Sequence, residues 1–174
     1  MKYLFLLLFS LSTTLINAQT LGIDAFFAKY RHAPNTIAFA VPGWLVNLGL
    51  AASGEAAEYR EIYQPVAKRL GSIRVLVMED QNRSKPKEIK QLIKNAQHCN
   101  FQELLSVQDG NTTIKVMLRE KQLKRKTIIK NILFLVAEED NLVLATLNGR
   151  WKKEVLTKLL QENTSNFESV VGVL

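Results

Sequence analysis

The chain has 174 residues, 47% of them hydrophobic, and its 23 Lys and Arg against 16 Asp and Glu give a net charge of +7. This length suffices for one domain with a sizeable core, and the excess positive charge favours anionic partners. The single cysteine, Cys99, excludes an internal disulfide, so the apolar core has to hold the fold together. We expect Cys99 to be a buried, inert thiol, with an intermolecular disulfide as the alternative.

Residues 1–18 have the order of a secretory signal peptide. A single positive charge precedes an apolar run from Tyr3 to Leu11, and a polar stretch then ends in Ala18. The run is shorter than the roughly 20 residues that span a bilayer, so we expect cleavage after Ala18 and not a membrane anchor. The mature chain, residues 19–174, is then predicted to form a single domain with no transmembrane span. Without a cysteine at the cleavage site, it is expected to be exported to the periplasm or cell envelope and not lipid-anchored.

The first elements of the mature chain are predicted to alternate between helices and isolated strands. Apolar residues at helical spacing predict helices over 21–32 and 57–70, and a β-branched run predicts a strand over 35–41. Gly71 is expected to stop the second helix and to be followed by a strand over 72–80.

A third helix is predicted over 85–98, with Ser84 as its N-cap. Residues 101–107 are interpreted as a helical turn that runs into a strand. Asp109 and Gly110 then mark a turn.

Three apolar strands are predicted over 112–120, 128–137 and 142–147, followed by a closing helix over 150–163 with Trp151 on its packed side. The strands should form an antiparallel meander with one face on the core. The sequence therefore predicts an α+β fold. Its sheet should be mostly antiparallel, with helices packed on one face and a C-terminal β-meander before the closing helix.

Several segments together resemble a known family. "FFAKY" follows the signal sequence, "LGSIRVL" opens a strand, and "LATLNGRW" precedes the closing helix. In these the chain resembles the bacterial envelope family catalogued as domain of unknown function 4252. The resemblance implies an envelope protein of Gram-negative bacteria of the Bacteroidetes type, with no catalytic residues to carry over. Some such proteins look like lipoproteins, and this chain departs from them in lacking the lipid-accepting cysteine.

No motif points to an enzyme, and the sequence therefore predicts a non-enzymatic protein without cofactors. His98 and Cys99 are sequence neighbours, and adjacent helical residues point about 100° apart, which disfavours a nucleophile and base pair. Neither a zinc-ligand spacing nor a phosphate-binding glycine loop is present. Residues 138–141, "EEDN", gather three carboxylates but lack the spacing of a calcium loop, so we interpret them as a solvated hairpin turn.

A basic run between two predicted strands is the candidate anion-binding site. Its cations are Arg119, Lys121, Lys124, Arg125 and Lys126. They would bind an anionic lipid head group, a glycan or the membrane surface. The alternative is a solvated loop that discourages edge-to-edge strand pairing. Nucleic acid is disfavoured, because no aromatic residues are interleaved to stack on bases.

Residues 42–52, "PGWLVNLGLAA", form the candidate partner-binding segment. Pro42 is expected at the first helical position, and only Asn47 interrupts the apolar residues that follow. A helix that is apolar all round has to be buried on more than one side. We prefer burial in the core; the alternative is a partner surface with Trp44, Leu45 and Leu48 as anchors.

Two functions follow from these patterns. The first is an envelope module that binds a protein partner or associates with itself through the 42–52 segment. The alternative is a carrier of a small ligand or lipid in a cavity between sheet and helices, with the basic run at its mouth.

Overall fold

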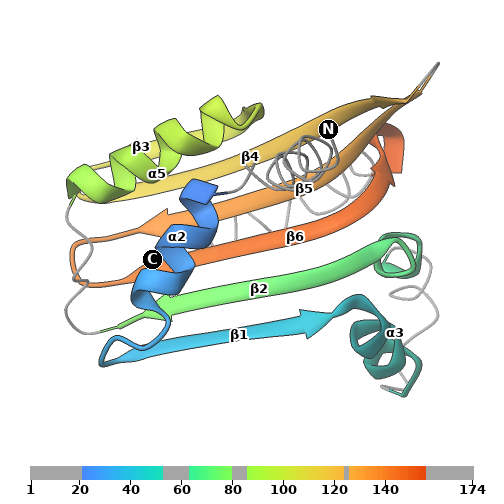
Figure 1. Cartoon of the computed structure of the whole chain (residues 1–174), viewed down its shortest axis with the longest axis horizontal. Helices are drawn as coiled ribbons and strands as arrows, with labels where there is room; N and C mark the ends of the chain where they lie inside the picture. Colours follow the sequence, from blue (N-terminus) through green and yellow to red (C-terminus); the bar gives the residue numbers. More distant parts are fainter. Residues whose placement is uncertain (1–20, 53–62, 80–85, 124–125, 156–174) are drawn as a thin grey trace, which may run out of the picture.

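The computed structural model describes residues 21–52, 63–79, 86–123 and 126–155 (Figure 1). Six strands form one antiparallel sheet in the order β1-β2-β6-β5-β4-β3. The strands are β1 (Thr36–Pro42), β2 (Leu70–Met78), β3 (Phe101–Asp109), β4 (Thr112–Leu123), β5 (Lys126–Ala137) and β6 (Leu142–Lys152). The helices are α2 (Leu21–Tyr30), α3 (Gly43–Ala52) and α5 (Pro86–His98). The predicted α+β class with an antiparallel sheet is confirmed.

The last three strands, β4 to β6, form the predicted meander, which β3 extends on one side and β2 and β1 extend on the other. Gly110, at a φ of 52°, supplies the left-handed residue in the turn between β3 and β4. The turn between β5 and β6 is closed by a 2.8 Å hydrogen bond from the backbone N–H of Glu138 to the carbonyl oxygen of Asn141. β2 then pairs with the free side of β6, and β1 pairs with β2. This order leaves β1 and β3 as the two edges of the sheet.

Helices α2 and α5 lie side by side on one face of the sheet (Figure 1). Their apolar stripes, including Phe26, Phe27 and Leu92, pack on inward-facing side chains such as Leu133 and Leu144. The stripe of α5 has the three- and four-residue spacing of an amphipathic helix, while its lysines remain exposed. Half-buried Cys99 packs against this same cluster, in place of the full burial expected. α3 does not join this layer and lies beyond the end of β1.

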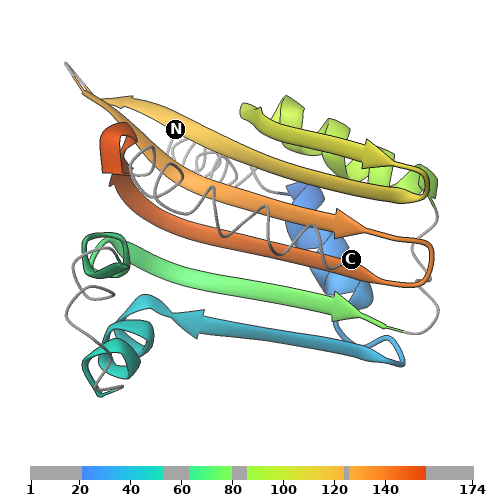
Figure 2. The same ribbon diagram turned by 180° about the vertical axis from the view of Figure 1, so that it is seen from behind.

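The opposite face of the sheet is also apolar, and neither α2 nor α5 covers it (Figure 2). The register places aliphatic and aromatic side chains there from four adjacent strands, for example Val75, Leu147, Phe134 and Val116. Strands with two apolar faces read as continuous hydrophobic runs, which explains residues 132–137, "ILFLVA".

Part of this second face is closed by a cluster around Trp151. The fully buried indole packs with Ile129 and Ile132 and donates a 2.9 Å hydrogen bond to the carbonyl oxygen of Val66. Trp151 lies in β6, so its predicted position on the packed side of the closing helix is wrong. Residues 153–155 are helical, and the remainder of that predicted helix lies outside the described residues.

The boundaries predicted for the helix over 57–70 and the strand after it also differ from those in the structure. Residues 63–67 are helical, but β2 already begins at Leu70, and the register shifts between Leu70 and Ser72. Gly71 therefore lies within the strand and does not stop the helix; a Cβ there would be 3.3 Å from the carbonyl oxygen of Asn148 on β6. Residues 57–62 and Ser84, the predicted N-cap, lie outside the described residues.

Residues 101–107 are extended throughout, so the predicted helical turn at their start is wrong. They pair with β4 on one side, and a register shift between Glu103 and Leu105 accommodates the adjacent apolar residues Leu104 and Leu105. Within the described ranges, no helix is long and apolar enough to cross a membrane.

Candidate functional site

Large apolar side chains are exposed together at the β1 edge of the sheet, and we call this group the β1–α3 surface. Their exposed fractions are 58% for Ile37, 48% for Phe39, 67% for Trp44, 43% for Leu45 and 58% for Leu48. The last three are the predicted partner-binding anchors, and their exposure contradicts the preferred interpretation of this segment as core. Exposed apolar groups gathered in one place mark an interaction site more often than scattered ones do.

α3 is fixed on the side that faces β2 and Ala67, which leaves Trp44, Leu45 and Leu48 facing outward. It begins at Gly43 and not at Pro42, which is the last residue of β1. Gly43 is buried against β2, where an added Cβ would lie 1.9 Å from the carbonyl oxygen of Leu70. Asn47, the one polar side chain of the segment, donates from Nδ2 to the carbonyl oxygens of Gly43 and Ala67, both at 2.8 Å. The helix is therefore fixed through its backbone and one amide.

Among the described residues, β1 is an edge strand that pairs on one side only. It pairs with β2 in an uninterrupted register, and residues 36–52 contain no charged side chain. The other edge strand, β3, carries Glu103 and Asp109 and a register shift, which are features that discourage strand addition. Of the two edges in the described sheet, β1 is thus the one whose backbone suits pairing with an additional strand.

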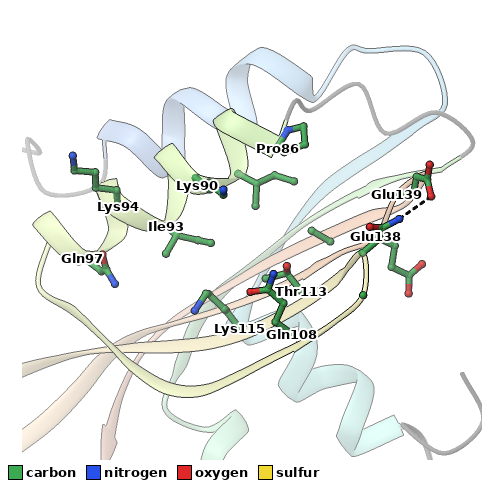
Figure 3. Close-up of a pocket in the computed structure, with 14 residues that line it drawn as sticks. Pro86, Lys90, Ile93, Lys94, Gln97, Gln108, Thr113, Lys115, Glu138 and Glu139 are labelled. Atoms are coloured by element: carbon green, nitrogen blue, oxygen red, sulfur yellow. Dashed lines mark hydrogen bonds between the residues drawn. The ribbon is translucent and has the colours of Figure 1, made fainter.

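A groove of about 1040 Å³ runs between α5 and the strands beneath it (Figure 3). Ile89 and Ile93 line it with apolar surface, while Lys90 and Lys94 stand on its α5 side. Lys115, from β4, bonds through Nζ to Glu103 Oε2 at 2.5 Å and to Ser106 Oγ at 2.7 Å. The groove combines apolar lining with cations, as a site for an amphipathic anion does.

The described part of the predicted basic run lies within two strands and not in a loop between them. Arg119 and Lys121 lie within β4 and Lys126 begins β5, whereas Lys124 and Arg125 lie outside the described residues. The long hairpin extends both strands through the run because their backbones continue to pair after a shift in register at Arg119 and Glu120.

Arg119 is part of a polar row that crosses the sheet. Its guanidinium donates to Asn131 Oδ1 from Nε at 2.9 Å and from Nη2 at 2.6 Å, and lies 5.5 Å from the ring centre of Phe101. The Asn131 amide donates to Asn148 Oδ1, whose own amide donates to Ser72 Oγ at 3.1 Å. Four neighbouring strands thus share one hydrogen-bonded row at the end of the apolar layer.

The row forms part of a hollow of about 490 Å³, which we call the Lys130 hollow. Its lining residues are Asn100, Arg119, Glu120, Lys121, Lys130, Asn131, Asn148 and Gly149. Partial burial lowers the pKa of Lys130, and the positive charges of Arg150, Lys121 and Arg119 lower this pKa further. Sequence reasoning missed Lys130 and Arg150, although each is a cation beside an asparagine or glycine in an otherwise apolar strand.

The expected turn at "EEDN" has side-chain bonds of its own. Asn111 Nδ2 donates to Glu139 Oε2 at 3.1 Å, and Asn141 Nδ2 donates to Glu138 Oε2 at 3.3 Å. No group of three His, Cys, Asp or Glu side chains suited to a metal ion occurs in the part of the chain that the structure describes.

The fold is that of a small α+β protein with a six-stranded antiparallel sheet, two helices on one face and an exposed apolar edge. The chain belongs to the family described as Domain of unknown function (DUF4252), which matches residues 30–159. This match spans β1 to the end of β6 and so includes both the β1–α3 surface and the Lys130 hollow. No curated protein matches the chain.

Proposed function

We propose that this protein is an exported, non-enzymatic component of the cell envelope that binds a protein partner or a second copy of itself through the β1–α3 surface. The observation that carries the proposal is the exposure of Trp44, Leu45 and Leu48 on a helix that is anchored through Gly43 and Asn47. The signal-peptide pattern of residues 1–18 supports export.

The composition of the surface suits a protein partner. Tryptophan is enriched among the residues that dominate binding energy, and charged residues are depleted at interface centres. Trp44 and Phe39 supply rigid aromatic groups, and no charge within residues 36–52 would have to be desolvated. The unpaired edge of β1 adds backbone donors and acceptors that a partner strand would satisfy.

Leu48→Asp in the mature chain, residues 19–174, should abolish association without unfolding the monomer. A carboxylate at the centre of the interface would lose its hydration on binding, which weakens affinity by at least about tenfold. Native mass spectrometry of protein isolated gently from its own envelope would measure the bound fraction. Leu104→Asp is the matched control, because Leu104 is 49% exposed on the other edge strand.

The proposal requires that only Leu48→Asp loses the partner while both variants keep the melting temperature of the parent. Equal association of Leu48→Asp and parent would contradict it. If the Leu48→Asp monomer unfolds, α3 is part of the core, and this result would also contradict the proposal.

The groove beside α5 favours a second candidate function, the transport of a small amphipathic ligand or lipid. Ile89 and Ile93 would contact an apolar chain, and Lys90 or Lys94 an anionic head group (Figure 3). A lipid that co-purifies with the parent and is lost in Ile93→Asp would support this function over protein binding.

A further inference from the structure

We propose that the Lys130 hollow binds a phosphate group, held by Lys121 and Lys130 with Arg150 beside them. The site is separate from the β1–α3 surface. Its lining cations come from two adjacent strands, β4 and β5, and the positive charge of Arg150 on β6 also acts on Lys130. Of the described cations in the predicted basic run, Arg119 and Lys121 line it.

The charge at this hollow is unbalanced. Within the described residues, the ion pairs do not include Lys121, Lys130 or Arg150. Among the described lining residues, the one carboxylate, that of Glu120, lies 3.4 Å from Lys153 Nζ and is thus paired with another cation. Like charges drawn together repel each other, and a bound anion relieves that repulsion.

Irregular strand pairing places the cations at the hollow. The register shifts between Arg119 and Glu120 in β4 and between Ile129 and Asn131 in β5, so Lys130 has no partner in the ladder. Such bulges bend a strand and redirect its side chains, and they are over-represented next to functional sites. The polar row from Arg119 to Ser72 keeps the neighbouring side chains in fixed positions.

The donors match a tetrahedral oxyanion. Ammonium groups offer three N–H donors each and a guanidinium five, and the Asn131 and Asn148 amides each have a second N–H beyond the one used in the row. A phosphate presents several acceptor oxygens and up to two charges, so it compensates more of this cluster than a carboxylate does. The hollow, at about 490 Å³, is large enough for a phosphate with the group that it esterifies.

Titration of the isotopically labelled mature protein with inorganic phosphate tests the site. We expect saturable shifts of the Asn131 and Asn148 side-chain amide signals in NMR spectra, at constant ionic strength. Lys121→Gln/Lys130→Gln should weaken binding by at least about tenfold, since both lysines line the hollow and the change removes two charge-assisted contacts. Arg31→Gln/Lys87→Gln changes the net charge equally and should leave the affinity within about twofold, because both side chains are exposed and neither lines the hollow.

A second titration, with soluble short-chain phosphatidylglycerol, identifies the source of the phosphate. Binding of both ligands at the same amides assigns the site to phosphate in general, and tighter binding of the lipid by about tenfold or more assigns it to a lipid head group. The proposal is overturned if neither ligand shifts these amides saturably. It is also overturned if both double variants lose affinity equally, because the attraction would then depend on net charge alone.

Discussion

Trp151→Ala is expected to lower the free energy of unfolding by about 3–5 kcal/mol. The side chain has no exposed surface, and its removal opens a cavity among Ile129, Ile132 and Val116. It also leaves the carbonyl oxygen of Val66 without its 2.9 Å hydrogen bond. Small domains are stabilised by only about 5–15 kcal/mol, so this single change should remove a large share of the total.

Urea unfolding followed by circular dichroism measures this loss. Val143→Ala is the control on the same strand, because Val143 is 36% exposed. This change should lower the free energy of unfolding by less than about 1 kcal/mol. Trp151→Phe keeps much of the volume and removes the indole N–H, which separates packing from the hydrogen bond. A loss of only about 1 kcal/mol in Trp151→Ala would mean that the indole is not at the centre of the second cluster.

Gly43→Ala is expected to destabilise the protein by at least about 1–3 kcal/mol, because the new methyl group meets backbone that cannot move aside. The added Cβ would lie 1.9 Å from the carbonyl oxygen of Leu70 and 2.6 Å from its carbon. Relief requires α3 to move away from β2, which would also strain the hydrogen bond from Asn47 to the carbonyl oxygen of Ala67 outside the helix.

Gly49→Ala in the same helix is the matched control. A Cβ at Gly49 has no neighbour within 4 Å, and alanine favours a helix interior over glycine by about 1 kcal/mol. The two variants should therefore shift the thermal midpoint in opposite directions. Equal midpoints for both would show that α3 does not pack on β2 as closely as the structure has it.

Periodicity in the sequence predicted most elements because strand and helix spacing are local properties. It failed where one residue suits both patterns: Trp151 fits the apolar stripe of a helix, yet it pairs with Ile129 across two strands. Leu104 and Leu105 interrupt the alternation of a strand, and the register shift beside them explains why. A bulge depends on the partner strand and so cannot be identified from one segment.

The sites were harder to predict because they depend on strand order. Val75 pairs with Ala145, 70 positions further along the chain, and nothing in either segment specifies the other. This pairing makes β1 an edge strand and exposes Trp44 beyond it. In the same way, Lys130 and Arg150 come together only through the pairing of β5 with β6. The sequence instead predicted an anion-binding site at residues 119–126, because the cations there are close together along the chain.

A photo-crosslinking amino acid at position 44 tests the β1–α3 surface most directly, in cells that express the full chain. Trp44 is 67% exposed, so the substitution should leave the fold intact. Position 87, also exposed but on α5, is the control. We predict one crosslinked product of defined mass from position 44, either a dimer or a complex with one envelope protein, and none from position 87. No product from position 44, or the same products from both positions, would contradict the proposed interface.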